Sequence, residues 1–215
     1  AVRRLDNPQG CSSALGDPDG WSFTRARTNG SISGTLGAQC FTFTRAEAEA
    51  DGAYWFRTIR TAGSANPEWT VYGPSGEQEC SNTYYSYLPV CDLTAEGTYA
   101  LVVESASGEG SGAYVLGARR LNAPSGCAAI KAPTFGVPPS FGSISTAGEV
   151  DCYAARLGAG DELTFHTTGT ANEFALLNEN GEVVCANVGA TCTAAHDGTY
   201  SILLYADANQ SGSYQ

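Results

Sequence analysis

The sequence contains no methionine, only two histidines and few charged residues, which make up 15% of its 215 positions. Basic residues are the scarcer kind, because 11 Lys and Arg stand against 22 Asp and Glu and give a formal net charge of −11. Nucleic-acid binding needs a basic face for the phosphate backbone, so no nucleic-acid partner is expected. No apolar run approaches the roughly 18 residues that cross a bilayer, so no membrane span is predicted.

Aromatic residues and cysteines, by contrast, are plentiful. The 8 Phe, 3 Trp and 11 Tyr can fill hydrophobic cores, so a disordered chain is not expected. The 8 cysteines form no Cys-x-x-Cys motif and no Cys/His cluster, which argues against zinc fingers and redox motifs. We expect four disulfides in a secreted, extracellular protein, because disulfides persist in oxidising compartments.

The chain repeats itself. Residues 3–11, RRLDNPQGC, are echoed by residues 119–127, RRLNAPSGC, and the same order of cysteines and of Gly-Thr-Tyr motifs follows in both copies. We therefore predict two tandem domains, residues 1–118 and 119–215. Four cysteines per copy allow three connectivities, and pairing within each copy is the simplest. The favoured pairs are Cys11–Cys40, Cys80–Cys91, Cys127–Cys152 and Cys185–Cys192.

Short stretches that alternate apolar and polar residues predict strands almost throughout. Residues 161–167 alternate with Leu163 and Phe165 on the buried face, and residues 174–185 read as a hairpin around an Asn-Glu-Asn-Gly turn. Further strands are expected at 54–60, 69–72, 98–104 and 199–205. The predicted fold class is all-β, with two tandem jelly-roll-like antiparallel β-sandwich domains that each hold two internal disulfides.

The motifs of the second copy resemble those of a known family. The motifs are Asp-Cys-Tyr at 151–153, LGAGDELTF at 157–165, LLNENG at 176–181, DGTY at 197–200 and SGSY at 211–214. Residues 145–215, and more weakly 33–117, resemble the bacterial pre-peptidase C-terminal domain. The resemblance implies a small jelly-roll sandwich attached to secreted enzymes, without catalysis of its own, sometimes binding collagen, other extracellular polymers or Ca²⁺.

No catalytic constellation is apparent, so the chain is not expected to be an enzyme. The two histidines, His166 and His196, have no counterparts in the first copy and are interpreted as surface residues, because a general base needs a positioned partner. The sequence Gly-Ser-Ile-Ser-Gly at 30–34 has Ile32 where a nucleophile elbow needs serine. The glycine-rich 108–112 segment lacks the lysine of a phosphate loop and is read as a hairpin connection.

No cofactor or metal is predicted, with calcium kept as an alternative. Residues 17–20 and 47–51 carry carboxylates two positions apart, the kind of oxygen ligand that Ca²⁺ takes. Neither segment fits the twelve-residue calcium loop. We interpret them as a turn and a solvated segment.

Aromatic residues that the repeat does not explain are the candidate binding residues, because rigid rings with polar tips suit recognition. Trp55 aligns with Phe165 and Trp69 with Phe174, so both tryptophans are assigned to the core. If Trp55 faces inward, its two neighbours face outward. A loop between Cys80 and Cys91 adds a tyrosine cluster at its tip. The predicted partner-binding residues are Trp21, Tyr54, Phe56, Tyr84, Tyr85 and Tyr87. The alternative is that these residues pack one domain on the other or cover a loop.

The two ends of the chain also carry a prediction. Residues 1–4 match residues 117–120, as though another copy or a linker preceded them. The second copy stops at Gln215, where the first copy continues with Val115–Gly117, so its last strand is truncated or shorter. We expect a fragment or a component of a larger assembly, with an exposed strand edge that a neighbouring segment completes.

The predicted function is a non-catalytic extracellular binding or targeting module of a secreted bacterial protein. Its partner would be an extracellular protein or polysaccharide, contacted through the exposed aromatic residues. The alternative is a structural or assembly subunit, such as an adhesin, filament or toxin-complex component, whose partners are neighbouring domains.

Overall fold

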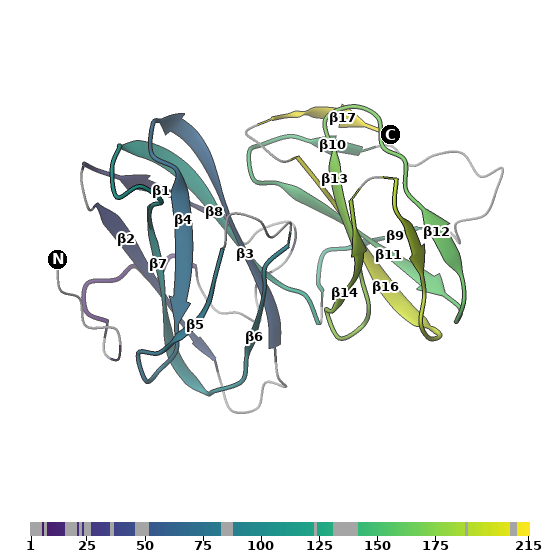
Figure 1. Ribbon diagram of the computed structural model, residues 1–215, viewed down its shortest axis with the longest axis horizontal. Coiled ribbons are helices and arrows are strands. Elements are labelled where there is room, and N and C mark those ends of the chain that lie inside the picture. The colour runs from purple at the N-terminus through teal and green to yellow at the C-terminus, as the bar shows by residue number, and fades with distance from the viewer. Residues whose placement is uncertain are drawn as a thin grey trace. The chain divides into compact units, whose positions relative to one another are not determined.

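The structure is a computed structural model (Figure 1). It describes residues 6, 8–15, 21, 23, 27–34, 37–45, 52–82, 88–122, 124–130, 142–187, 189–206 and 210–215. Within these segments every regular element is a β-strand, and no helix is long and apolar enough to cross a membrane. The predicted all-β fold class is therefore confirmed.

The chain divides into two compact units. Unit 1 comprises Ala1–Trp21 and Arg25–Arg120, and unit 2 comprises Ser22–Thr24 and Leu121–Gln215. The boundary predicted after residue 118 falls inside the last strand of unit 1, and the observed one follows Arg120. A short piece of the first copy belongs to unit 2, where the backbone N–H of Phe23 donates to the Ser125 carbonyl at 3.1 Å.

Eight strands form the described part of unit 1. They are β1 (Arg27–Ile32), β2 (Ala38–Arg45), β3 (Gly52–Gly63), β4 (Pro67–Tyr72), β5 (Gln78–Ser81), β6 (Val90–Leu93), β7 (Gly97–Ser105) and β8 (Gly112–Arg120). One sheet has the order β1-β8-β3-β6 and the other β2-β7-β4-β5. Every pair is antiparallel.

This strand order is that of a jelly roll. The chain changes sheet at every connection except the β4–β5 hairpin, so that β1 and β8, β2 and β7, and β3 and β6 become neighbours. The repeated alternation of apolar and polar residues gives each strand one face for the interior. The sequence prediction of a jelly-roll-like sandwich is confirmed for this unit.

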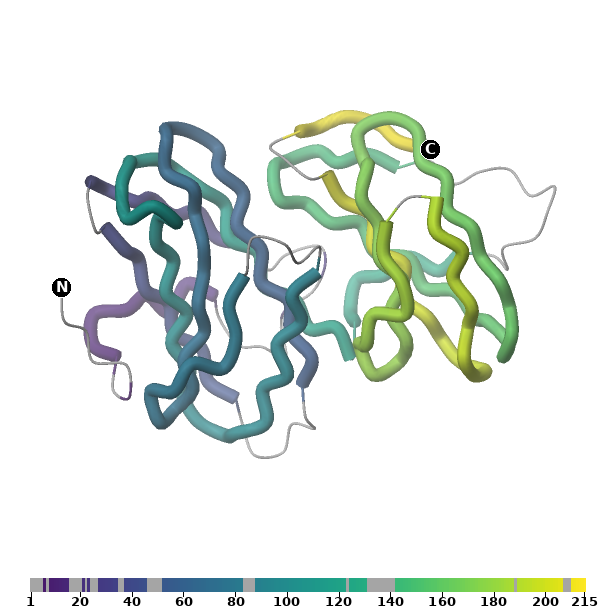
Figure 2. Tube along the Cα trace, in the orientation of Figure 1, coloured from purple at the N-terminus to yellow at the C-terminus, as the bar shows by residue number. Residues whose placement is uncertain are grey.

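Unit 2 repeats the arrangement with shorter strands. They are β9 (Ala128–Ala129), β10 (Gly142–Ile144), β11 (Val150–Leu157), β12 (Glu162–Thr164), β13 (Glu173–Leu177), β14 (Val183–Ala186), β15 (Thr191–Thr193), β16 (Gly198–Tyr205) and β17 (Gly212–Tyr214). The sheet β14-β13-β16-β11 matches β5-β4-β7-β2, and β9 joins it in parallel. The strand pairs β12–β15 and β10–β17 form two further two-stranded sheets, and Gly169, which follows β12, makes an isolated bridge to Tyr214 of β17. Figure 2 traces the chain through these strands.

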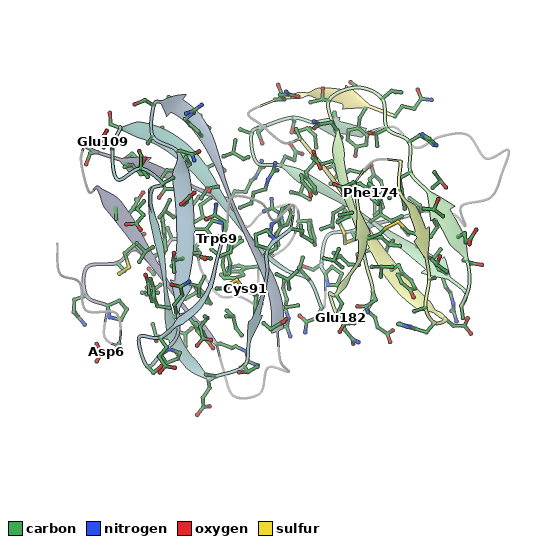
Figure 3. All side chains as sticks on the ribbon, viewed as in Figure 1. Asp6, Trp69, Cys91, Glu109, Phe174 and Glu182 are labelled. Carbon is green, nitrogen blue, oxygen red and sulfur yellow. A yellow bond between two sulfur atoms is a disulfide. The ribbon has the colours of Figure 1, made fainter. Side chains whose placement is uncertain are left out.

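Each unit buries its own core, and the strongest core predictions are correct. Trp69 in β4 is 2% exposed, and Phe174, its counterpart in β13, is fully buried (Figure 3). The tyrosines of the two Gly-Thr-Tyr motifs are buried as well. The hydroxyl of Tyr99 donates to the Ala95 carbonyl at 2.6 Å, so this ring anchors the turn four residues before it.

All four predicted disulfides are present, and no cysteine is free. They join Cys11 to Cys40, Cys80 to Cys91, Cys127 to Cys152 and Cys185 to Cys192. The sequence separations are 29, 11, 25 and 7 residues. On the chain-entropy model the longest loop stabilises by roughly 3.5 kcal/mol and the shortest by roughly 2.5 kcal/mol. Four disulfides indicate an oxidising environment.

Candidate functional site

Three of the six predicted binding aromatics lie in the core of unit 1 instead of on its surface. Trp21 is 3% exposed, and Tyr54 and Phe56 are fully buried. They pack in one hydrophobic cluster with Phe43 of β2 and Trp69 of β4, so the cluster contains side chains from both sheets. The prediction that these three residues are exposed is wrong.

The prediction for Tyr54 and Phe56 failed because it aligned the two copies with an error of one residue. In unit 1 Tyr54 lies opposite Cys91, and in unit 2 Leu163 lies opposite the matching Cys192. Phe165 therefore corresponds to Phe56, not to Trp55. Because successive side chains of a strand point to opposite faces, a one-residue slip exchanges inside and outside.

Trp21 was predicted to bind a partner because the second copy has no counterpart for it, but in unit 1 it is a core residue. Its ring lies 5.0 Å from the Phe43 ring and 5.5 Å from the Phe56 ring, both edge to face. Its indole N–H donates to the Leu15 carbonyl at 2.8 Å, which satisfies the only polar group of the ring.

Trp55 is buried on the face of β3 opposite to Tyr54 and Phe56. The Arg119 guanidinium, directly across from it on β8, lies 5.5 Å from its ring centroid, and that of Arg57 lies 5.8 Å away. Both distances suit cation–π attraction. Trp55 and Arg119 therefore form a buried stack and not an exposed aromatic contact.

The remaining candidates, Tyr84, Tyr85 and Tyr87, lie outside the described residues. The structure does define what flanks them. The Cys80–Cys91 disulfide joins β5 of one sheet to β6 of the other, and Leu88 at the end of the segment is 7% exposed. The segment is thus tied at its base, at the same place where the shorter Cys185–Cys192 loop is tied in unit 2.

The histidines and the acidic segments form no described catalytic or metal site. His166 is exposed, and His196 lies beside Tyr200, whose hydroxyl donates to the His196 carbonyl at 3.0 Å. No group of three His, Cys, Asp or Glu suited to a metal ion occurs among the described residues. The alternative calcium segments, 17–20 and 47–51, fall outside them.

Sequence reasoning missed a polar junction that both units share. In each unit the tyrosine of the last strand lies directly across from a glycine, Tyr114 from Gly30 and Tyr214 from Gly142. A Cβ atom on either glycine would come within 2.2 Å of the tyrosine side chain, so only glycine fits beneath the ring. The Gly-Ser-Ile-Ser and Gly-x-Tyr motifs, which both copies contain, could have indicated this junction.

The two junctions differ in the group that accepts the hydrogen bond. The Tyr114 hydroxyl donates to the side-chain amide oxygen of Gln39 at 2.7 Å. In unit 2 the Tyr214 hydroxyl donates to the carboxylate of Asp151 and contacts the Tyr153 hydroxyl at 2.7 Å. A neutral acceptor in one unit is thus an ionisable acceptor in the other.

The environment of Asp151 favours its neutral form. Burial raises the pKa of this carboxyl above its ordinary value, the hydrogen bond from Tyr214 lowers the pKa in part, and the nearby Glu149 carboxylate raises it again. Burial and the bond to Asp151 also raise the pKa of the Tyr214 hydroxyl, which therefore stays protonated.

A second feature of unit 2 is a strand edge to which no described strand is paired. β12 pairs with β15 on one side. On the other side, two backbone hydrogen bonds between Thr168 and Gln215, of 3.0 and 3.1 Å, are the last pairing with the C-terminal strand. We call the backbone of residues 162–166 on this side the open edge. The side chains of Glu162, Thr164 and His166 in this stretch are exposed.

Comparisons with known proteins do not assign the chain to a family. No model of a known protein family matches the chain, and a search of curated proteins finds no significant match. The fold and the disulfides therefore define the class by themselves: a pair of all-β units with jelly-roll strand order and four disulfides. The resemblance to the pre-peptidase C-terminal domain stays a prediction.

Proposed function

We propose that the chain is a non-catalytic binding module of a secreted bacterial protein, similar in role to a pre-peptidase C-terminal domain. Many of its reactive and polar side chains stabilise the fold. Every cysteine is in a disulfide, and the hydroxyls of four buried tyrosines, Tyr99, Tyr114, Tyr200 and Tyr214, make internal hydrogen bonds. The four disulfides suit an extracellular location.

The contact surface that we propose is the loop between Cys80 and Cys91. The observation that carries this proposal is the disulfide itself, which ties the two ends of the loop to strands of different sheets. A loop held in this way loses less conformational entropy when it binds. With Trp21, Tyr54 and Phe56 in the core, the aromatic contact to an extracellular protein or polysaccharide is assigned to Tyr84, Tyr85 and Tyr87.

The experiment compares binding of the wild-type chain and of the triple variant Tyr84→Ala, Tyr85→Ala, Tyr87→Ala to a glycan array and to immobilised fibrillar collagen. We expect the triple variant to lose at least about tenfold in affinity, the effect of truncating two or three interface anchors. Val183→Ala, which shortens an apolar side chain that is 38% exposed in unit 2, is the control and should bind like wild type. Equal binding by all three chains, or no binding by wild type, would contradict the proposal.

The second candidate function is a structural or assembly subunit. The open edge of unit 2 favours it, because a strand edge to which no described strand is paired is a template for another strand. This role needs no aromatic surface, so it is independent of the tyrosine loop.

A further inference from the structure

We propose that Asn180 is a site of spontaneous covalent modification, in which its side-chain amide becomes a carboxylate, and that the side chain of Asn178 sets the rate. The chemistry is attack by the backbone nitrogen of the next residue on the asparagine side chain, with water as the co-reactant. The inference depends on neither the binding role nor the assembly role.

The sequence contains two Asn-Gly pairs, Asn29–Gly30 and Asn180–Gly181. Asparagine is a thermolabile residue. A following glycine favours the attack, because no Cβ shields its nitrogen and its backbone rotates easily. Both asparagines are exposed. The backbone around each pair therefore decides which of the two reacts.

The first pair is held in a strand. Asn29 and Gly30 lie in β1 and are paired with Val115 and Tyr114 of β8. The Tyr114 side chain also covers Gly30, since a Cβ atom on this glycine would lie 2.2 Å from it. The Gly30 nitrogen can reach the Asn29 side chain only if the strand pair opens. We therefore expect Asn29 to be protected.

The second pair lies in the turn of the hairpin that β13 and β14 form in unit 2 (Figure 1). Gly181 has a φ of 80°, and its N–H donates to the Asn178 carbonyl at 3.0 Å, which closes the turn. The structure shows no hydrogen bond from the side-chain amide of Asn180 to a described residue. This amide can therefore rotate toward Gly181 once the turn opens.

Asn178 holds the turn closed through its side chain, which is 8% exposed. The side-chain oxygen accepts hydrogen bonds from the N–H groups of Asn180 and Glu182, both at 3.0 Å. The side-chain nitrogen donates to the carboxylate of Glu182 at 2.6 Å, and Figure 3 labels this glutamate. While these bonds persist, the Gly181 nitrogen stays bonded to the Asn178 carbonyl. Asn178 therefore controls how often the nitrogen becomes available.

The reaction proceeds in two steps. In the first, the Gly181 nitrogen bonds to the side-chain carbonyl carbon of Asn180, the C–N bond of the side-chain amide breaks, and ammonia leaves with the proton of the attacking nitrogen. In the second, water opens the resulting five-membered imide at one of its two carbonyl carbons. The products are aspartate or isoaspartate at position 180, and no atom is oxidised or reduced.

The modification changes the turn in two ways. It adds a negative charge beside Glu179 and Glu182, which are both exposed. Isoaspartate also lengthens the backbone by a methylene group, which displaces the Gly181 N–H from its acceptor. Because β13 carries Phe174 of the core, we expect unit 2 to lose stability as the modified form accumulates.

The first test incubates the wild-type chain and Asn180→Gln at mildly alkaline pH and maps their peptides by mass spectrometry over time. Asn180 should be converted at least about tenfold faster than Asn29, because a turn opens more readily than a strand pair. Asn180→Gln should gain no carboxylate at position 180, since the longer side chain does not form the five-membered ring. An isoaspartyl methyltransferase with labelled S-adenosylmethionine detects the isoaspartate product. Equal conversion of the two asparagines, or an unmodified Asn180, would overturn the proposed site.

The second test measures the conversion of Asn180 in Asn178→Ala and Asn178→Asp. Asn178→Ala should convert about fivefold faster than wild type, the effect of losing a hydrogen bond of ordinary net strength. Asn178→Asp still offers an oxygen to both N–H groups and should stay closer to wild type. Amide exchange in β16 checks that unit 2 remains folded in both variants. Equal rates in all three chains would overturn the role of Asn178.

Discussion

At the scale of single residues, the clearest difference between the two units is Gln39 in one and Asp151 in the other. Both accept a hydrogen bond from the tyrosine that covers a glycine of the neighbouring strand. The amide is neutral at every pH, whereas the carboxylate is partly desolvated and has a raised pKa. A carboxyl whose folded pKa is raised stabilises fully below its unfolded pKa of about 3.9, and this contribution is lost as pH rises through the folded pKa.

Asp151→Asn should therefore make unit 2 more stable than wild type at pH 8 and leave it unchanged near pH 3. The asparagine keeps an oxygen acceptor for Tyr214 and removes the charge. The gain should stay below about 1 kcal/mol, because Asp151 is only partly buried and water screens its charge. Denaturant-dependent amide exchange in β11 and β16 at the two pH values measures it.

The mirror variant is the control. Gln39→Glu places a carboxylate at the same position of unit 1 and should destabilise that unit at pH 8 but not at low pH. All three tryptophans belong to unit 1, so tryptophan emission reports this transition. A gain from Asp151→Asn that is equal at both pH values would contradict the assignment of the effect to ionisation.

At the scale of elements, the close pairing of the first and last strands of each unit depends on glycine. β1 passes beneath Tyr114 of β8 at Gly30, and β10 passes beneath Tyr214 of β17 at Gly142. In both cases the tyrosine ring occupies the space that a side chain on the glycine would need, so the ring covers the backbone that the glycine leaves bare. The shared arrangement explains why both copies contain glycine at this point.

Gly142→Ala should destabilise unit 2 by about 1–3 kcal/mol, because the added methyl group overlaps the Tyr214 ring and hydroxyl, which are held by Asp151. The lower stability should make the amides of β11 and β16 exchange at a lower denaturant concentration than in wild type, and denaturant-dependent amide exchange measures it.

Gly158→Ala is the matched control in the same unit. Its new Cβ would meet its nearest neighbour, the Asp197 carboxylate, at 3.5 Å, which is ordinary contact. This variant should be neutral or slightly stabilising. Equal losses from the two substitutions would show that the tyrosine does not set the requirement for glycine.

At the scale of the whole molecule, the two copies in the sequence are not the two units in space. Phe23 precedes the first strand of unit 1 in the chain but belongs to unit 2 and is 3% exposed. Leu15, eight residues earlier, belongs to the core of unit 1. The start of the chain therefore contributes to both units.

Phe23→Ala should lower the free energy of unfolding of unit 2 by about 3 kcal/mol and that of unit 1 by less than about 0.5 kcal/mol. Leu15→Ala, as the control, should destabilise unit 1 alone by at least about 2 kcal/mol. Tryptophan emission follows unit 1 and amide exchange in β13 and β16 follows unit 2. A shift of the tryptophan transition by Phe23→Ala would contradict the assignment of Phe23 to unit 2.

Much of the fold could be predicted from the sequence, because local patterns carry it. The echo of residues 3–11 in residues 119–127 indicated two copies, alternation indicated strands, and the conservation of four cysteine positions between the copies gave the four disulfides. The candidate site was predicted less well. The tyrosine loop is a sequence feature, but the assignment of Tyr54 and Phe56 to a surface depended on which face of β3 is inside.

By itself the sequence determined the number of copies and the strand character, since these depend on composition and spacing along the chain, and it favoured the disulfide pairs that the structure contains. The tertiary structure alone decided three things: the inward face of β3, the unit to which Phe23 belongs, and the side of β12 that no described strand covers. The physical reason is that a strand has a period of two. Its pattern shows that one face is apolar, but the partner strand sets the register, and a slip of one residue reverses the faces.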